Sequence, residues 1–397
     1  MKRYVIALLL LVCACQEGGT KITETITVNP GSLTAGNELA SYKVDVMSNT
    51  SWTVVLEDES GASVQWATLS RSSGRGNATV TVRVLENAYK DSRTAYIVFK
   101  TSTGQRAVVS LIQEGDTSSS TESGSVELRI GTYNLRTSDS DIGTVNEWSV
   151  RKDRLKQSIL DCDFDIVALQ ELQPDQQAWL RSELGSVYDF RFFSPYSRTG
   201  AEGTKAAQGI GFKVGKISIS DWHFFWAADN PDVMTEADVS PATGTGYNRG
   251  GCCGTFTHIA SGVKIFVMNC HGCLFDDANA KYAHVYVDRE KMYNESGLPS
   301  FFIGDMNESP NSTPGSPYMT YTEHWKDSYT EIDDSERTGP EGTYNGFNTP
   351  NGKTREDYVF FRGSKIVLKH YTCDKTRYDG MYASDHFPVY VDAVVYK

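Results

Sequence analysis

The sequence predicts two folded domains, a small all-β sandwich of the immunoglobulin-like kind followed by a larger α/β domain built of layers. Its 397 residues exceed what one hydrophobic core usually contains. Residues 116–125 are rich in serine and threonine without apolar periodicity, which is typical of a linker. Before this linker, short segments alternate apolar and polar residues with the period of a β-strand. After it, strand-like runs alternate with helix-like stretches. We therefore expect the sandwich at residues 22–115 and the α/β domain at residues 126–397.

The composition is that of an acidic globular protein with many turns. Hydrophobic residues make up 39% of the chain and charged residues 22%, and 34 residues are glycine, which argues against long disordered or coiled-coil stretches. The formal net charge is −12. A chain with this balance has no broad basic face, which argues against tight, salt-sensitive binding of long nucleic acid but not against small anionic substrates.

Residues 1–15 are typical of an export signal. A basic start precedes an apolar run, residues 4–12, that is too short to span a bilayer as a permanent helix. The sequence Val-Cys-Ala-Cys at its end resembles a bacterial lipobox, so Cys15 is expected to carry a lipid anchor. The alternative is an ordinary signal peptide, with Cys15 an incidental thiol. We expect an exported lipoprotein, attached to the cell surface or the periplasmic face of a membrane through this anchor only.

The expected sandwich contains two tryptophans, Trp52 and Trp66. With the turn at residues 73–77 and Gln113 in the last strand, they resemble a BACON module that covers roughly residues 22–115. Modules of this type were proposed to bind glycans. We expect both tryptophans in the core, because an aromatic ring inside a sandwich buries a large apolar area, and we favour a spacer over a glycan-binding module. The expected strands include residues 41–46, 78–84, 94–99 and 107–112.

In the α/β domain, several apolar runs end on polar residues of the types used in metal binding and acid–base catalysis. Strand ends of a layered α/β fold share one edge of the sheet, so such residues can converge from distant positions. Any one of them is more typical of a cap or a turn, but the repetition of the pattern favours a site. The residues are Asn134, Glu171, His271, Asp305, Asn307 and the pair Asp385-His386, which directly precedes a strand expected at residues 387–395.

These residue types fit the hydrolysis of a phosphate ester with a divalent cation. Oxygen ligands without a soft thiolate are the donor set that Mg²⁺ or Mn²⁺ prefers, and we expect one or two ions. His271 and His386 are candidates for proton transfer because imidazole titrates near neutral pH. Asp357 is expected to hold His386 through the other ring nitrogen. The oxygen donors are Glu171, Asp305, Asn307 and Asp385.

The same residues lie in six ordered motifs, which are Gly131–Leu135, Leu169–Glu171, Asn269–His271, Gly304–Asn307, Arg355–Phe360 and Ser384–Val389. Together they resemble the endonuclease/exonuclease/phosphatase superfamily, whose DNase I-like fold is a four-layer α/β (α+β) sandwich. The resemblance spans about residues 126–397. It implies a metal-dependent phosphoesterase that acts on monoesters or diesters of nucleic acid, phospholipid head groups or sugar phosphates.

The resemblance also implies which residues bind the metal and the substrate. Asn134, Glu171 and Asp385 are expected at the metal ion. Asn134, Asn307 and Arg249 are expected to contact the phosphate of the substrate. The alternative for Arg249 is a solvated position on the surface.

The expected proton transfers involve two histidines with different partners. Asp305 is expected to position and deprotonate the attacking water, and His386, held by Asp357, to stabilise the phosphoryl oxygens or transfer a proton. His271 is the candidate acid for the leaving group. However, Gln208 occupies the place where many members carry its glutamate partner, and a neutral amide cannot stabilise an imidazolium. The rival hypothesis is therefore a non-catalytic, glycan-binding surface protein with a decayed enzyme domain, although the other site residues are retained.

The α/β domain also contains six cysteines, which an oxidising compartment favours as disulfides. A hairpin expected about Ser261-Gly262 places Cys253 opposite Cys270, and we predict a disulfide between these two. A second bond, between Cys252 and Cys273, follows less directly from the same register. The alternative is a zinc site of four thiols.

Overall fold

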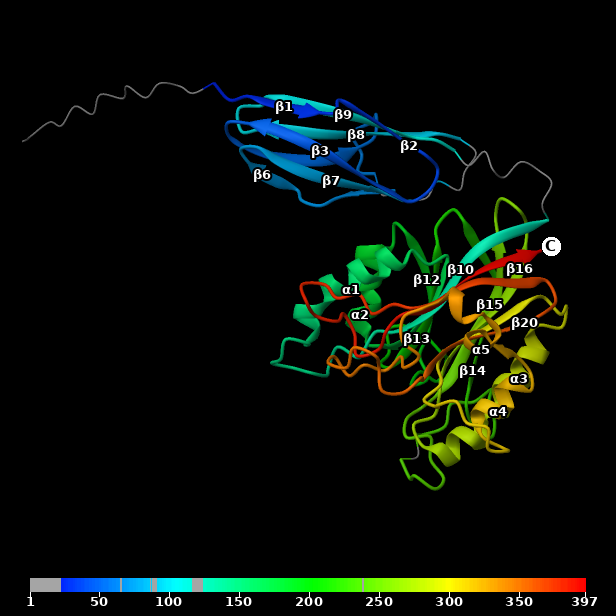
Figure 1. The fold of residues 1–397 in the computed structure, drawn as a ribbon. Helices are drawn as coiled ribbons and strands as arrows, with labels where there is room; N and C mark the ends of the chain where they lie inside the picture. Colours follow the sequence, from blue (N-terminus) through cyan, green and yellow to red (C-terminus); the bar gives the residue numbers. More distant parts are fainter. Residues whose placement is uncertain (1–22, 65, 86, 88–90, 116–123, 238) are drawn as a thin grey trace, which may run out of the picture. The chain divides into compact units, whose positions relative to one another are not determined.

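The computed structural model describes residues 23–64, 66–85, 87, 91–115, 124–237 and 239–397 (Figure 1). They form two compact units, and the chain passes from the first to the second at Glu114 and Gly115. The expected lipoprotein signal with Cys15 lies outside the described residues, as does most of the expected linker. No helix in the described part of the chain is long and apolar enough to cross a membrane.

The first unit is a sandwich of two β-sheets, as the period-2 pattern predicts (Figure 1). One sheet has the order β1 (Ile26–Asn29), β3 (Ala40–Ser48), β7 (Ala78–Val84) and β5 (Ala67–Leu69). The other has the order β2 (Ser32–Ala35), β9 (Arg106–Gln113), β8 (Arg93–Thr101), β4 (Ser51–Glu57) and β6 (Ser73–Arg75). Alternate residues of the strands fill the core, as Val80, Val82 and Val84 of β7 do.

Both tryptophans of the first unit pack on this core. Trp52 is 2% exposed, its ring meets Phe99 edge-on at 5.6 Å, and its Nε1 donates to the carbonyl oxygen of Gly76 at 2.9 Å. Trp66 is half-buried, and the guanidinium of Arg93 lies 4.6 Å from the centre of its ring. The predicted core position is confirmed for Trp52, whereas Trp66 lies at the margin.

The second unit contains two mixed sheets. The first has the order β12 (Tyr188–Phe193), β13 (Ala207–Lys213), β11 (Ile166–Leu172), β10 (Ser125–Asn134), β22 (Val389–Tyr396), β21 (Ile366–Cys373) and β19 (Arg337–Thr338). The second has the order β14 (Ile217–Trp226), β15 (Gly250–His258), β16 (Lys264–His271), β17 (Ser300–Asp305), β20 (Asp357–Arg362) and β18 (Lys326–Asp327).

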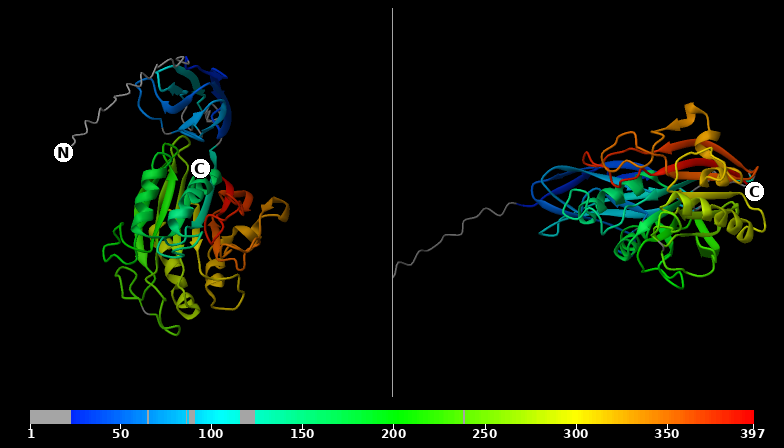
Figure 2. Two further views of the ribbon diagram at one scale, coloured as in Figure 1. Left: turned by 90° about the vertical axis from the view of Figure 1, so that its left-hand side faces the viewer. Right: turned by 90° about the horizontal axis from the view of Figure 1, so that it is seen from below.

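Helices cover the outer faces of both sheets, which gives the four layers predicted from the sequence (Figures 1 and 2). On the first sheet, Ser158 of a helix contacts the hydroxyl of Tyr133 in β10 at 3.4 Å. On the second sheet, Tyr286 of another helix packs against Phe302 of β17, with ring centres 5.5 Å apart. The helices are α1 (Trp148–Cys162) and α2 (Pro174–Leu184) on the first sheet, and α3 (Asp276–Tyr293) and α4 (Pro317–Thr322) on the second. The short α5 (Ser328–Glu331) and a 3₁₀ turn (Asp334–Glu336) complete the unit.

Buried amides join the two sheets beneath the strand ends. The core between the sheets is otherwise apolar, with residues such as Ile166 and Ile303 fully buried. Gln170 Nε2 donates to Asn269 Oδ1 at 2.9 Å, and Asn269 Nδ2 donates to the carbonyl oxygens of Leu169 and Gly209 at 3.0 and 2.7 Å. Because a buried amide without partners is costly, this network holds the strand ends of the two sheets in one arrangement.

The register of β15 and β16 shows that the predicted disulfides are wrong. Cys253 lies opposite Met268, and Cys270 lies two residues farther along β16. Diagonal positions of this kind are about 7–8 Å apart, beyond the usual reach of a disulfide. Cys252 faces the core between the sheets, whereas Cys273 packs on the side of α3, so these two are separated as well. The cysteines of the second unit are buried and free.

The turn between the two strands explains the error. Five residues, 259–263, connect the strands, and the turn is closed by the N–H of His258, which donates to the carbonyl oxygen of Val263 at 2.9 Å. The turn is centred between Ala260 and Ser261, one residue earlier than the turn expected about Ser261-Gly262, so the pairing is displaced by two residues. Neither group of possible metal ligands in the described residues contains a cysteine, so the zinc alternative has no support there.

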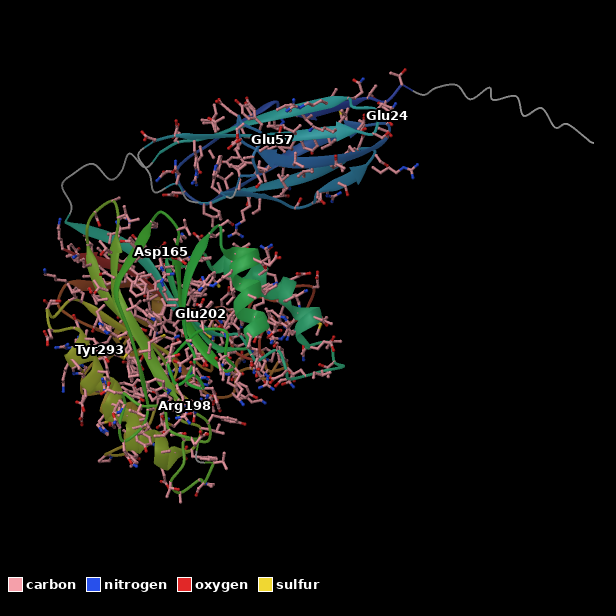
Figure 3. All side chains as sticks on the ribbon, turned by 180° about the vertical axis from the view of Figure 1, so that it is seen from behind. Glu24, Glu57, Asp165, Arg198, Glu202 and Tyr293 are labelled. Atoms are coloured by element: carbon pink, nitrogen blue, oxygen red, sulfur yellow. The ribbon has the colours of Figure 1, made fainter. Side chains whose placement is uncertain are left out.

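Asp165 stabilises the end of the first sheet that lies away from the strand ends described above (Figure 3). Its carboxylate accepts a hydrogen bond from the N–H of Arg129 at 2.9 Å and lies 3.2 and 3.1 Å from the ammonium groups of Lys213 and Lys216. Burial raises the pKa of Asp165, but the two lysines outweigh burial and lower it to about 2. This stabilisation is therefore present above pH 3.8, the ordinary value, and is lost as the pH falls towards 2.

Replacing Asp165 with asparagine is expected to lower the free energy of unfolding at pH 7 by about 2 kcal/mol. Urea denaturation measures this change, and the difference from the wild type should shrink as the pH approaches 2. The control is Glu183→Gln, because the exposed ion pair of Glu183 with Lys156 should contribute less than about 0.5 kcal/mol. Equal stability of Asp165→Asn and the wild type at pH 7 would contradict the role of the ion pairs.

Candidate active site

The polar strand ends of the second unit converge at one edge. β10 and β11 run parallel, as do β16 and β17, so the carboxyl ends of each pair lie together. Asp305 at the end of β17 lies opposite His271 of β16 on one side and Asp357 of β20 on the other. The segment before β22 reaches the same edge, where the hydroxyl of Ser384 donates to the carbonyl oxygen of Asn134 at 2.7 Å.

Two residues at this edge have backbone conformations that L-amino acids rarely adopt. Glu171 has a φ of 64° at an irregularity in the pairing of β11, and Asn307 has a φ of 48° just after β17. Such conformations cost about 1–3 kcal/mol each and persist where the surrounding structure holds them. Gly304 has a φ of 149°, and a Cβ atom there would clash with the carbonyl oxygen of Cys270, so only glycine lets β17 approach β16 this closely.

Asn134 joins two carboxylates at the centre of the site. Its Nδ2 donates to Glu171 Oε1 at 3.1 Å and to Asp305 Oδ2 at 2.9 Å. Its Oδ1 accepts from the N–H of Arg136 at 3.0 Å, which fixes the orientation of the amide. The other oxygen of Glu171 accepts from the N–H of Thr137 at 3.1 Å. Two acidic groups therefore converge on a single neutral donor group, an arrangement that favours a bound cation.

His386 and Asp357 form a buried pair. His386 Nδ1 lies 2.8 Å from Asp357 Oδ2, which also accepts from the hydroxyl of Thr343 at 2.6 Å. Burial alone lowers the pKa of His386, but the carboxylates of Asp357, Asp305 and Asp385 outweigh burial and raise it well above its ordinary value. His386 is thus an imidazolium at neutral pH, with Nε2 directed towards Asp305 at 3.9 Å.

Asp305 lies between the two histidines. Its Oδ2 is 3.6 Å from His271 Nε2 and 3.9 Å from His386 Nε2. Burial raises the pKa of Asp305 to about 7, against the opposing effect of the His386 charge. A carboxyl group with this pKa can accept or release a proton near neutral pH, which is the property required of a general base.

The neighbour of His271 is an arginine, whereas the neighbour of His386 is the carboxylate of Asp357. Arg249 Nη1 lies 3.4 Å from His271 Nδ1, and because a guanidinium only donates, Nδ1 accepts and the neutral ring carries its proton on Nε2. Burial, Arg249 and His386 lower the pKa of His271 well below its ordinary value. Arg249 is only 8% exposed, so the alternative of a solvated surface arginine is wrong.

Gln208 lies close to this histidine but is directed elsewhere. Its Nε2 donates to the carbonyl oxygen of Gly250, which is paired with His271 across the strands, at 2.8 Å. Its buried Oε1 has no hydrogen-bond partner among the described residues. The neutral state of His271 agrees with the presence of Gln208 instead of a glutamate. It counts against His271 as the acid for the leaving group, and that role stays a prediction.

Asp385 and Asn307 complete the set of residues expected at the site. Asp385 Oδ2 lies 3.4 Å from Arg136 Nη1, and burial raises the pKa of Asp385. The N–H of Asn307 donates to Asp305 Oδ1 at 2.9 Å, and its side chain donates to the carbonyl oxygen of Gly272 at 3.4 Å.

The described residues contain two groups whose ligand atoms are close enough to share a metal ion. They are Glu171 with His271 and Asp305, and Asp305 with Asp357 and His386. Within each group the ligand atoms lie within 4.8 Å of one another. The donor set is mostly carboxylate oxygen, which fits a hard divalent cation that keeps part of its water shell. Asp385, expected at the metal, belongs to neither group.

Sequence reasoning missed several residues that contact the site. Thr343 and Tyr344 come from the loop before β20, where no periodicity singles them out, and the ring of Tyr344 lies 5.1 Å from that of His386. Arg136 could have been found, because it stands two residues after the end of β10 and directly follows the first motif.

Comparison with known proteins agrees with this geometry. Residues 131–386 match the model of the Endonuclease/Exonuclease/phosphatase family, and residues 46–114 match the BACON model, described as "Putative binding domain, N-terminal". The chain belongs to the endonuclease/exonuclease/phosphatase family, so in general terms it is a hydrolase of the phosphoesterase type, and enzymes of this family typically depend on a divalent metal. No curated protein matches the chain.

Solved structures from Bacteroides share the fold. A family member from Bacteroides thetaiotaomicron is 22% identical, with a TM-score of 0.60, over 68% of this chain and 98% of that one. A second, from Bacteroides vulgatus, is 24% identical, with a TM-score of 0.58, over 68% of this chain and 98% of that one. A mannosyl-6-phosphatase from Bacteroides thetaiotaomicron is 23% identical, with a TM-score of 0.57, over 67% of this chain and 99% of that one.

Proposed function

We propose that the second unit hydrolyses phosphate esters with a bound divalent cation, Mg²⁺ or Mn²⁺. The observation that carries the proposal is the position of Asp305, a buried carboxyl group with a pKa of about 7. It lies within 4 Å of both His271 and His386 and shares the amide of Asn134 with Glu171. In-line attack of water on a phosphoryl group requires a base that can take up a proton near neutral pH, a nearby cation and a fixed imidazolium. The arrangement around Asp305 provides these features.

Some side chains of the site act on the attacking water and others on the phosphoryl group. Glu171, with Asn134 and Asp385 beside it, would hold the cation, which when bound would neutralise charge on the phosphoryl oxygens. Asp305 accepts the proton of the attacking water. His386, kept protonated by Asp357, stabilises the oxygens that gain charge in the transition state.

The other side of the site binds the substrate. Arg249, with a buried Nε that has no hydrogen-bond partner among the described residues, contacts the phosphate together with the amides of Asn134 and Asn307. His271 donates from Nε2 as a neutral ring. It is therefore a weak candidate for supplying the proton of the leaving group.

A screen of hydrolysis tests this proposal. Protein from Gln16 onward is incubated with Mg²⁺ or Mn²⁺ and nucleic acid, phospholipid or sugar phosphates, including mannose 6-phosphate because of the phosphatase that shares the fold. We expect metal-dependent hydrolysis in one class, abolished in Asp305→Ala and retained in the surface variant Glu183→Gln. Absence of hydrolysis in every class with either metal, from protein that melts cooperatively, would overturn the proposal.

We further propose that the protein is an exported lipoprotein in which the first unit serves as a spacer. The spacer is supported by the burial of Trp52 and by the partial burial of Trp66, which leave the sandwich with no exposed tryptophan among its described residues. The anchor is supported by the lipobox-like sequence before Cys15.

Replacing Cys15 with serine is expected to move the protein from the membrane fraction to the soluble fraction, because the lipid would be its attachment. The matched control is Cys13→Ser, which changes a cysteine that is removed with the signal and should leave the protein in the membrane. Fractionation followed by a salt wash and immunoblotting measures the effect. If Cys15→Ser stays in the membrane pellet, the lipobox interpretation is wrong.

A further inference from the structure

Arg136 stands where the segment after β10 turns away from the site. Its φ is 55°, a left-handed conformation that is strained for arginine. Its carbonyl oxygen accepts hydrogen bonds from the guanidinium of Arg151 in α1 and from Gln176 Nε2 in α2, the latter at 2.9 Å. Its N–H donates to Asn134 Oδ1 at 3.0 Å. Two helices therefore fix the backbone that orients the central amide of the site.

The guanidinium of Arg136 lies between two carboxylates. Nη1 is 3.4 Å from Asp385 Oδ2, and Nε donates to Asp141 Oδ2 at 3.1 Å. Asp385 is 4% exposed, and its backbone is held by the N–H groups of Asn345 and Gly346, which donate to its carbonyl oxygen at 2.7 and 3.0 Å. The backbone position of Asp385 is thus fixed, and its carboxylate is held by Arg136 at Oδ2 and by the hydroxyl of Ser384, which donates to Oδ1 at 3.4 Å.

We propose that Asp141 and Arg136 form a positioning pair that holds the carboxylate of Asp385 in place beside the cation. The proposal rests on the function proposed above. Asp141 is outside the site and accepts a hydrogen bond from Nε of Arg136. The Nη1 of the same guanidinium contacts Asp385. A fork of this shape can bridge two carboxylates in one orientation, which the single ammonium of lysine cannot do.

A positioning role and a role of charge alone predict opposite results for cation binding. If Arg136 acted only by its charge, Arg136→Ala would remove repulsion and tighten the binding of a divalent cation, and Arg136→Lys would change nothing. If it positions Asp385, both variants weaken binding because the carboxylate loses its orientation. Asp141→Asn is the sharpest variant, since it alters no group of the site and asparagine tolerates the φ of 60° found there.

The experiment measures the dissociation constant of Mn²⁺ by electron paramagnetic resonance in the intact protein, together with kcat and KM on the substrate found in the screen. We expect the dissociation constant to rise about 10-fold in Arg136→Lys, the lower end of the range for partners of ligand groups, and by less, about 3-fold, in Asp141→Asn, which acts one contact farther away. The value of kcat should fall at limiting metal and recover at saturating metal, with KM unchanged. The control Glu202→Gln, which alters an exposed ion pair with Arg181, should leave all three constants unchanged.

A double-mutant cycle tests whether Arg136 acts through Asp385. In an Asp385→Asn background, Arg136→Lys should weaken Mn²⁺ binding by less than 2-fold, because the group that it positions has lost its charge. Tighter binding in Arg136→Ala, or a full effect of Arg136→Lys in the Asp385→Asn background, would overturn the positioning role. Wild-type protein that hydrolyses its substrate without any metal would instead overturn the proposed function.

Discussion

Replacing His386 with alanine is expected to lower kcat by about 100-fold or more, the scale of a positioned acid–base or charge-stabilising group. The reason is that His386 is buried, bonded to Asp357 at 2.8 Å and held in its protonated form beside Asp305. Steady-state kinetics on the substrate from the screen measures the loss, with circular dichroism to verify the fold. The control is His370→Ala. His370 is a half-buried histidine of β21 that is hydrogen-bonded to Thr338 and paired with Asp392, outside the site.

Two comparisons give this prediction its specificity. Asp305→Ala should cost as much as His386→Ala, because it removes the proposed base. His271→Ala should cost less than either, because the ring is neutral and has Arg249 rather than a carboxylate as its neighbour. A variant His386→Ala with near-wild-type turnover, or a larger loss in His271→Ala than in His386→Ala, would contradict the assignment of roles.

Replacing Glu171 with glutamine is expected to raise the metal concentration needed for half-maximal activity by about 10- to 100-fold, the range measured when a metal site loses a supporting group. Glutamine keeps the shape and can still accept from the N–H of Thr137, but it loses the charge that attracts the cation. Titration of Mg²⁺ and Mn²⁺ into metal-free protein measures the shift, and excess metal should restore part of the activity.

Chelation extends the same test to the wild type. EDTA should abolish activity, and added Mg²⁺ or Mn²⁺ should restore it. Glu183→Gln makes the same chemical change in an exposed ion pair of α2 and should behave as the wild type. Activity that survives EDTA, or a Glu171→Gln protein with an unchanged metal requirement, would mean that the site works without the cation.

The layered fold and the common edge of the strand ends are predictable from local patterns. Apolar periodicity identifies the strands, and a polar residue at the end of a buried strand marks where that strand leaves the core. For this reason Asn134, His271 and Asp305 are found from the sequence at the ends of β10, β16 and β17. The pairing of His386 with Asp357 is also predictable, since the motifs that contain them lie on neighbouring elements of the family fold.

Register, burial and protonation depend on contacts between residues distant in the sequence, and local patterns do not contain them. A turn centred one residue earlier than expected places Cys253 opposite Met268 instead of Cys270. Burial likewise makes Arg249 the neighbour of His271 rather than a surface residue. The pKa of Asp305 near 7 and the contact of Arg136 with Asp385 depend on strands and loops that come together only in the folded domain. Composition and pattern thus suffice for the fold class and for most site residues of this protein. Which of them carry charge, and which neighbour holds each in place, follows from the low-dielectric environment that tertiary packing creates.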